Sequence, residues 1–277
     1  MSHTQLIDNI PCKLKAPFDF TFLQKYGKVF KVYDEQDSGN ICFGITNGSS
    51  KYFVKFAGAP TEYSNVSVGE AITRMKETMQ IYRDLAHPTL TKLIDAEGIG
   101  DGFAMIFEWT DAECLGKQYP LSREKFLQMP MDTKISVFGD ILDFHMYVAE
   151  QGYVALDFYD GSIMYDFNIG KTVICDVEFY AKMPYRNSMG RMWGSSSYMS
   201  PEEFQLGAII DEITNVYTMG ATAFALLSED KSRDIGKWKL NKKLFDVAAK
   251  AVSNERGRRQ QSVKDFATEW KFALQSL

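Results

Sequence analysis

One lysine and two aspartates stand along the chain in an order that suits phosphoryl transfer. Lys55 lies in the strand-like run YFVKF, Asp157 follows the apolar run YVAL, and Asp176 ends the run TVICD. Transfer of a phosphoryl group needs a cation to hold the phosphates, a carboxylate to bind Mg²⁺ and a carboxylate to orient the attacking hydroxyl. These three residues supply the required groups, so the sequence predicts a site for a nucleoside triphosphate and Mg²⁺.

The residues around Lys55 are expected to form a β-rich segment with one helix. Strand-like runs cover 28–36, 40–46, 51–56 and 103–110, and polar turns separate the first three runs. A helix is expected over 68–86, because apolar residues recur there at spacings of three and four: Ile72, Met75, Met79 and Tyr82.

The second half of the chain is expected to be mainly helical. Two short apolar runs, 153–156 and 172–176, flank a hairpin-sized loop. The helices are expected over these ranges: 131–151, 211–228, 241–253 and 262–277.

These elements predict an α+β fold with two lobes. Residues 1–27 would form an N-terminal extension, residues 28–110 a small β-rich nucleotide-binding lobe, and residues 111–277 a large, mainly helical lobe with the catalytic loop. A cleft between two such lobes is the expected ligand site.

Net charge, apolar runs and cysteine spacing indicate which partners and which cellular compartment to expect. The net charge of −5 argues against nucleic acid as a partner, since polyanions attract basic surfaces. No run approaches the roughly 20 apolar residues that span a bilayer, and the N-terminus lacks the apolar core of a signal peptide. The four cysteines are scattered, with no C-x-x-C pair, as in reduced intracellular proteins. We therefore expect a cytoplasmic protein without membrane contact.

Several motifs resemble those of the eukaryotic-type protein kinase superfamily, from about residue 28 onward. The run YFVKF is similar to the V-A-I-K strand, and AMIFEWTDAECL (104–115) is similar to the segment that joins the two kinase lobes. GSSSYMSPEEF (194–204) resembles the G-T-x-x-Y-M-A-P-E end of an activation loop. NVYTMGATAFALL (215–227) and RQQSVKDF (259–266) resemble later helices, the second as found in bacterial Ser/Thr kinases.

The resemblance implies a bilobal kinase-like fold and a divergent Ser/Thr kinase that transfers the γ-phosphate of Mg-ATP to a protein substrate. Lys55 would hold the α- and β-phosphates, braced by Glu77, with Glu70 as the alternative. Asp157 would orient the attacking hydroxyl. Asp176 would bind Mg²⁺ together with one further oxygen ligand, Ser162 or Asp160.

The same resemblance assigns the nucleotide contacts and one structural ion pair. Gly39 would lie in the phosphate loop. Phe107 would be the gatekeeper of the nucleotide pocket, and the next three residues would face the adenine: Glu108, Trp109 and Thr110. Glu202 would form a buried ion pair with Arg259 and brace the larger lobe.

The chain departs from the kinase pattern at many positions. The phosphate loop DEQDSGN has one glycine among acidic residues, and Ser162 replaces a metal-binding Asn. Ala155-Leu156 replace the His-Arg before the catalytic Asp, which implies activity that does not depend on a phosphorylated loop. The other replacements are Tyr159 for Lys, Asp176-Val177-Glu178 for D-F-G, and Asn215 for Asp. Three loop hydroxyls are candidate autophosphorylation sites: Tyr180, Tyr185 and Ser188.

These departures leave two other functions open. The first is a pseudokinase that binds nucleotide or protein without transferring phosphate. The second is a small-molecule phosphotransferase of the aminoglycoside type, although the SYMSPEEF segment counts against it. Phosphate transfer distinguishes an active kinase from a pseudokinase, and the acceptor distinguishes a protein kinase from a small-molecule kinase.

Overall fold

The computed structural model describes residues 2–275, which divide after Asp111 into two compact units. Within the described residues the chain forms six α-helices, one five-stranded antiparallel sheet and several smaller antiparallel sheets. The α+β class expected from the sequence is therefore confirmed. The helix expected at the end of the chain forms over Val263–Leu274; the last two residues of its expected range, 276 and 277, lie outside the described residues.

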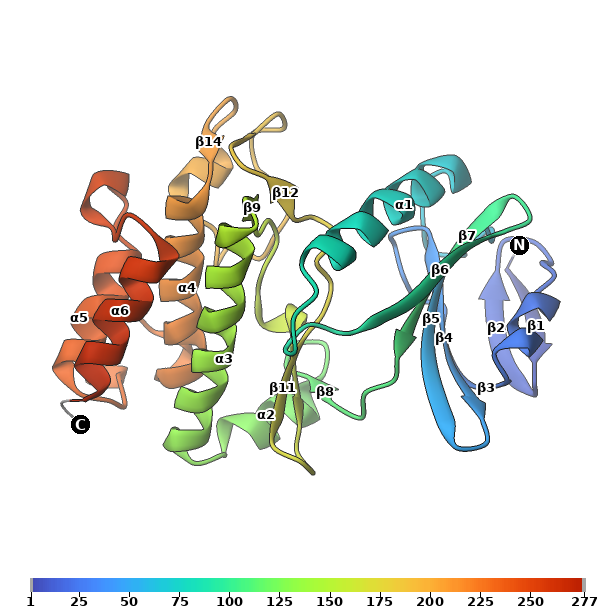
Figure 1. Ribbon diagram of the computed structural model, residues 1–277, viewed down its shortest axis with the longest axis horizontal. Helices are drawn as coiled ribbons and strands as arrows, with labels where there is room; N and C mark the ends of the chain where they lie inside the picture. Colours follow the sequence, from blue (N-terminus) through green and yellow to red (C-terminus); the bar gives the residue numbers. More distant parts are fainter. Residues whose placement is uncertain (1, 276–277) are drawn as a thin grey trace. The chain divides into compact units, whose positions relative to one another are not determined.

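The first unit is built on the five-stranded sheet, whose strands follow the order β3-β4-β5-β7-β6 (Figure 1). One hairpin, one short 3₁₀ helix (η1) and one α-helix complete the unit. The bounds are β1 His3–Ile7, β2 Ile10–Leu14, η1 Thr21–Lys25, β3 Lys28–Tyr33, β4 Asn40–Asn47, β5 Ser50–Ala57, α1 Val68–Asp84, β6 Leu93–Ile99 and β7 Gly102–Glu108.

Helix α1 begins at a capping box. The Ser67 hydroxyl accepts a hydrogen bond from the Glu70 N–H, and the Glu70 carboxylate accepts one from the Ser67 N–H at 3.0 Å. Its buried side chains recur at spacings of three and four, as on one helix face: Ala71, Met75, Thr78 and Tyr82.

The two faces of the sheet carry different side chains. Strand neighbours alternate between faces, so Val54 and Phe56 enter the hydrophobic core while Lys55 points to the opposite face. That core also contains Cys12, Leu14, Phe20 and Leu23. The residues before Lys28 are thus part of this unit's core.

The second unit is mainly helical, and helix α4 packs against α3, α5 and α6 (Figure 1). Helix α4 is almost completely buried, which fits a sequence with no charged residue after Glu212. The bounds are β8 Glu113–Cys114, α2 Pro120–Leu127, α3 Met131–Glu150, β9 Tyr153–Val154, η2 Asp160–Ser162, β10 Ile163–Asp166, β11 Lys171–Ile174, β12 Ala181–Lys182, β13 Tyr185–Arg186, η3 Pro201–Phe204, β14 Ile209–Ile210, α4 Glu212–Leu227, η4 Glu229–Lys231, η5 Ile235–Lys237, α5 Lys242–Ala251, η6 Arg256–Arg258 and α6 Val263–Leu274.

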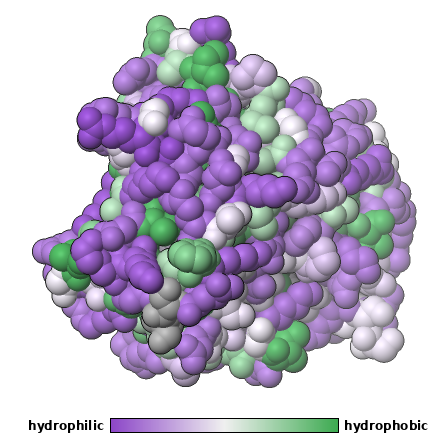
Figure 2. Space-filling view, turned by 60° about the vertical axis from the view of Figure 1, so that its left-hand side comes forward, coloured by the Kyte–Doolittle hydropathy of each residue, from purple (hydrophilic) through white to green (hydrophobic). Residues whose placement is uncertain are grey.

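The surface drawn in Figure 2 is largely hydrophilic, and its apolar residues form small separate groups. Among the helices of residues 2–275, none has the length and apolar character needed to cross a bilayer.

Candidate active site

Asp157 and Asp176 share an uncommon backbone conformation in the second unit. Their φ angles are 58° and 61°, in the left-handed region that non-glycine residues seldom adopt. Aspartate tolerates this region better than most residues, and such backbone clusters at functional sites. Asp157 follows β9 and Asp176 follows β11, so both carboxylates are presented by loops that leave strands.

A residue of helix α4 holds the loop that carries Asp157. The side-chain amide of Asn215 donates to the Ala155 carbonyl and its oxygen accepts from the Ala155 N–H, each at 2.8 Å. Both groups are buried, so the bonds are shielded from water. Asn215 therefore fixes the backbone two residues before Asp157.

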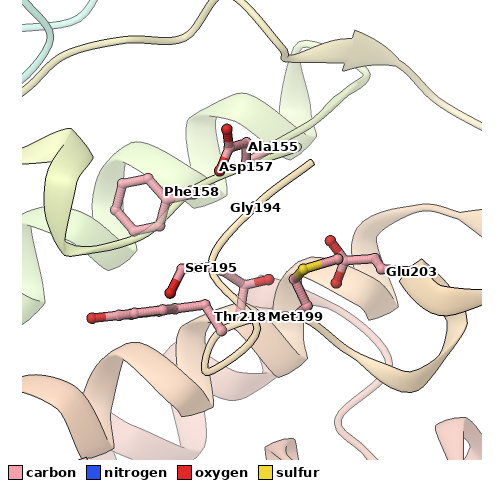
Figure 3. Close-up of a pocket in the computed structure, with 9 residues that line it drawn as sticks. Ala155, Asp157, Phe158, Gly194, Ser195, Met199, Glu203 and Thr218 are labelled. Carbon is pink, nitrogen blue, oxygen red and sulfur yellow. The ribbon is translucent and has the colours of Figure 1, made fainter. Parts of the chain in front are cut away.

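A small pocket opens beside Asp157. Figure 3 shows Asp157 and Phe158 on one side of the Gly194–Ser195 segment, with Thr218, Met199 and Glu203 on its other side. Gly194 has a φ of 130°, and a Cβ at this position would lie 3.4 Å from Asp157 Oδ1. The backbone angle favours glycine here, whereas a contact of 3.4 Å is ordinary for a Cβ atom.

Asp157 is poised to exchange a proton near neutral pH. Burial raises the pKa of Asp157 to about 6, and the nearby carboxylates of Asp176 and Glu178 add to this shift while Arg191 opposes it. A carboxyl with this pKa is mostly ionised at pH 7 yet more basic than an ordinary aspartate, as a general base requires.

Asp176 and Ser162 lie on adjacent backbone segments. The Cys175 N–H donates to the Ser162 carbonyl at 3.0 Å, which places the residue before Asp176 against the end of the Asp157 loop. Within residues 2–275, no three or more His, Cys, Asp and Glu side chains are grouped to hold a metal ion. Mg²⁺ needs only one or two carboxylates when phosphates supply further oxygens. The exposed Asp176 fits such a site.

Asp160 does not fit a metal site. Its Oδ2 accepts hydrogen bonds from Lys231 Nζ at 2.7 Å and from the Arg123 guanidinium, and its side chain is 5% exposed. Two cations already neutralise this buried carboxylate, so little negative charge is left for Mg²⁺. We assign Asp160 to a structural ion-pair cluster and not to the metal.

Tyr159 stands where the kinase pattern has a lysine. Burial raises the pKa of Tyr159 to about 12, and the charges of Asp157 and Asp176 act in the same direction, so the phenol stays neutral. Its ring lies over Gly161, where a Cβ would be 2.4 Å from the ring. Gly161 is therefore needed for this loop conformation, and Tyr159 brings no positive charge to the site.

In the first unit, Lys55 shares its sheet face with several aromatic side chains. The register pairs Lys55 with Cys42 and Met105, and pairs Phe53 with Gly44 and Phe107. Phe53 and Phe107 lie 6.1 Å apart between ring centroids. Phe53 is half-buried and Phe107 is buried, so Phe53 is the ring of this pair that stays partly accessible on the face of Lys55.

The structure does not place Glu77 on the buried face of α1. Glu77 is exposed, whereas the adjacent Thr78 is 3% exposed. The alternative, Glu70, is engaged in the capping box at the start of the helix. Neither glutamate therefore has the geometry of a buried brace for a lysine within the first unit.

The residues predicted to face adenine lie at the end of β7. Phe107 is buried and makes an edge-to-face contact with Tyr82, with centroids 4.9 Å apart. Glu108 is exposed and pairs with Lys92 at 3.1 Å. Thr110, which follows β7, is half-buried.

Trp109 and Phe30 lie together over Gly44. Their rings meet edge-to-face at 4.9 Å, and a Cβ on Gly44 would be within 2.9 Å of both. Trp109 Nε1 donates to Asp111 at 2.7 Å.

Gly39, which the sequence places in a phosphate loop, lies in the turn before β4. Its φ is 83°, and it lies against Ala71 of α1.

Glu202 and Arg259 meet in the interior of the second unit. Arg259 donates to both carboxylate oxygens of Glu202, at 2.7 and 2.9 Å. Arg256, which the sequence did not single out, also donates to Glu202 and makes two hydrogen bonds to Asp211. This cluster joins η3, the start of α4 and η6.

Glu203 is a pocket residue that the sequence reading missed. Its carboxylate accepts from the Ser200 N–H at 2.6 Å and from the Ser200 hydroxyl at 2.9 Å. Burial raises the pKa of Glu203 to about 7. The S-x-x-E spacing of Ser200 and Glu203 is the sequence signal for a capping box and would have identified this pair.

Comparison with protein-family models and with curated proteins finds no match to this chain.

Proposed function

We propose that the chain is a divergent Ser/Thr protein kinase of the eukaryotic type, which transfers the γ-phosphoryl group of Mg-ATP to a protein hydroxyl. The proposal includes a bilobal, kinase-like arrangement of the two units. The observation that carries it is Asp157: a carboxylate on left-handed backbone, in a pocket, near Asp176, with a pKa of about 6.

Each residue has a defined role in the proposal. Asp157 accepts a hydrogen bond from the attacking hydroxyl and takes its proton as the oxygen–phosphorus bond forms. Lys55 binds the α- and β-phosphates, and the aromatic face around Phe53 packs against the base. Mg²⁺, when bound with the nucleotide at Asp176, neutralises charge on the phosphates.

Intact-mass analysis after incubation with Mg-ATP and a generic protein acceptor tests the proposal. The wild type should add about 80 Da per transferred phosphate to itself or to the acceptor, and Asp157→Asn and Lys55→Ala should add none. Two exposed residues provide matched controls, Asp143→Asn and Lys28→Ala, which should behave as wild type. Equal transfer by Asp157→Asn would refute the role of Asp157.

A nucleotide- or protein-binding pseudokinase is the second candidate. Two observations favour it: Asp160 is neutralised by Arg123 and Lys231, and Tyr159 supplies no positive charge. A pseudokinase would show ATP-dependent thermal stabilisation that Lys55→Ala removes, without phosphate on any acceptor. Transfer to aminoglycosides but not to proteins would instead indicate a small-molecule phosphotransferase.

A further inference from the structure

The N-terminal hairpin, formed by β1 and β2, contacts the loop that joins β3 to β4. Strand β2 packs against β3 (Figure 1). The Lys13 N–H on β2 donates to Asp34 Oδ2 at 2.6 Å. The Val29 N–H on β3 donates to Asp8 Oδ2, in the turn of the hairpin, at 2.8 Å. Asp34 is the first residue of the phosphate loop, residues 34–40, so the hairpin holds this loop where it leaves β3.

A second connection between the hairpin and the phosphate loop runs through Ser64. The Ser64 hydroxyl donates to the Asp37 carbonyl at 2.7 Å and accepts from the Val66 N–H at 3.0 Å. The Ser64 carbonyl accepts a hydrogen bond from Lys15 Nζ, on the residue that follows β2. Ser64 is 1% exposed, so the bonds of its hydroxyl are shielded from water. The hairpin thus reaches the phosphate loop at both Asp34 and Asp37.

The phosphate loop lies near Lys55, whereas the hairpin lies on the opposite side of the sheet. The last residue of the loop, Asn40, is two residues before Cys42, which pairs with Lys55 across β4 and β5. Cys12 and Leu14 of the hairpin belong to the hydrophobic core on the face away from Lys55. The hairpin therefore holds the first carboxylate of the loop away from the face that carries Lys55.

This placement matters because the phosphate loop is acidic and a polyanion near its carboxylates is repelled. The acidic residues are Asp34, Glu35 and Asp37. Asp34 is half-buried, and its charge adds to burial in raising the pKa of Cys12 on β2 to about 12. Glu35 and Asp37 are exposed, where solvent screens their charges. The half-buried carboxylate, which solvent screens least, is thus the one bonded to the hairpin.

We propose that the N-terminal hairpin positions the phosphate loop for nucleotide binding, with Asp34 and Ser64 as the two positioning residues. This inference rests on the proposed function, because it takes Mg-ATP as the ligand of Lys55. The hairpin keeps the Asp34 carboxylate away from the phosphates. It also fixes the loop backbone, so that nucleotide binding does not have to order it. Both effects strengthen nucleotide binding and leave the chemical step unchanged.

Paired substitutions at Asp34 separate the anchor from the charge. Asp34→Asn removes the charge but keeps an oxygen that accepts from the Lys13 N–H, whereas Asp34→Ala removes both. Calorimetric titration with a non-hydrolysable Mg-ATP analogue should give a Kd about fivefold higher for Asp34→Ala than for Asp34→Asn. The matched pair, Asp101→Ala and Asp101→Asn in the exposed turn between β6 and β7, should give equal Kd values.

Ser64→Ala removes the second anchor and should raise the Kd by a similar factor. Ser49→Ala, in the exposed turn before β5, is its control and should bind as the wild type does. Backbone ¹⁵N order parameters of Glu35 and Gln36 should fall from about 0.85 to below about 0.6 in both Asp34→Ala and Ser64→Ala. Order parameters that stay at the wild-type values would overturn the inference.

Phosphate transfer by the same proteins separates this inference from the proposed function. Asp34→Ala should have a higher KM for ATP than Asp34→Asn, by the same factor as the Kd, with an equal kcat. Equal Kd values for the two Asp34 variants would overturn the role of the hairpin, whether or not phosphate is transferred. A wild type that binds the analogue but transfers no phosphate would overturn the proposed function alone. A wild type that does not bind the analogue would overturn both.

Discussion

Asn215 bonds both the N–H and the carbonyl of Ala155, at 2.8 Å in each case, across 60 residues of sequence. The side-chain amide carries an N–H donor and a carbonyl acceptor side by side, so it satisfies both backbone groups without a charge. The Asp expected here from kinase motifs could accept from the N–H but would face the carbonyl with a negative charge. Asn215 therefore anchors the backbone of the Asp157 loop through an uncharged pair of hydrogen bonds.

Replacing Asn215 by Asp should destabilise the second unit. The carboxylate would lose one buried hydrogen bond and lie against the Ala155 carbonyl, which costs about 1–3 kcal/mol of unfolding free energy. Urea denaturation measures the change. Asn168→Asp, on an exposed turn, controls for the added charge and should change stability little. An equally stable Asn215→Asp protein would show that the amide donor is dispensable.

Replacing Asp157 by Asn should stabilise the protein at high pH. The pKa of Asp157 rises from 3.8 to about 6 on folding, so folding favours the protonated form and ionisation at pH 8 costs stability. Allowing for partial solvent screening, Asp157→Asn should gain roughly 1–2 kcal/mol at pH 8.

This gain should diminish as the pH falls through 6 and vanish below 4, where the carboxyl is protonated in both states. Urea unfolding at pH 8, 6 and 4 measures it. A gain that does not depend on pH would contradict the raised pKa. In the proposed kinase, phosphate transfer by the wild type should fall in the same window, below about pH 6, because the base is then protonated.

Removing Arg259 should have a large effect on stability. Arg259→Met leaves Glu202 buried without its main partner, at a cost of about 3 kcal/mol. Arg258→Met is the matched control: Arg258 is exposed and pairs with the exposed Glu255, so its loss should cost well below about 1 kcal/mol.

The cost of Arg259→Met should also depend on pH. Burial by itself would raise the pKa of Glu202, but the hydrogen bonds from Arg259 dominate and lower it. The ion pair therefore stabilises the folded protein fully at pH values above the pKa that Glu202 has in the unfolded chain, near 4.5. This stabilisation is lost as the pH falls through the lower pKa that Glu202 has in the folded protein. Denaturation at pH 7 and pH 3 should show the larger difference at pH 7; the reverse order would contradict the pairing.

A methyl group on Gly44 should disturb the aromatic pair of the first unit. In Gly44→Ala the new Cβ would lie within 2.9 Å of Phe30 and Trp109, so the rings must shift, at a cost of about 1–3 kcal/mol. Tryptophan fluorescence and thermal unfolding measure both effects. Gly98→Ala on β6 is the control, since a Cβ there meets nothing within 4 Å. If the two variants behave alike, the rings do not depend on Gly44.

The sequence by itself determined the order and type of the main elements, because their signals are local. Helix periodicity predicted 68–86 and 131–151, and the helices form over Val68–Asp84 and Met131–Glu150. The Glu202–Arg259 contact followed from motifs alone. Residues 1–27 were the exception: no pattern in them showed that Leu14 and Phe20 enter the sheet's core.

Only the tertiary structure decided the charge state and the partners of the site residues. Asp160 is neutralised by Arg123 and Lys231, which lie 37 and 71 residues away in sequence. Burial and the approach of Asp176 set the pKa of Asp157. Desolvation and charge pairing depend on distances between segments that are remote along the chain, and the sequence order of the residues does not contain those distances.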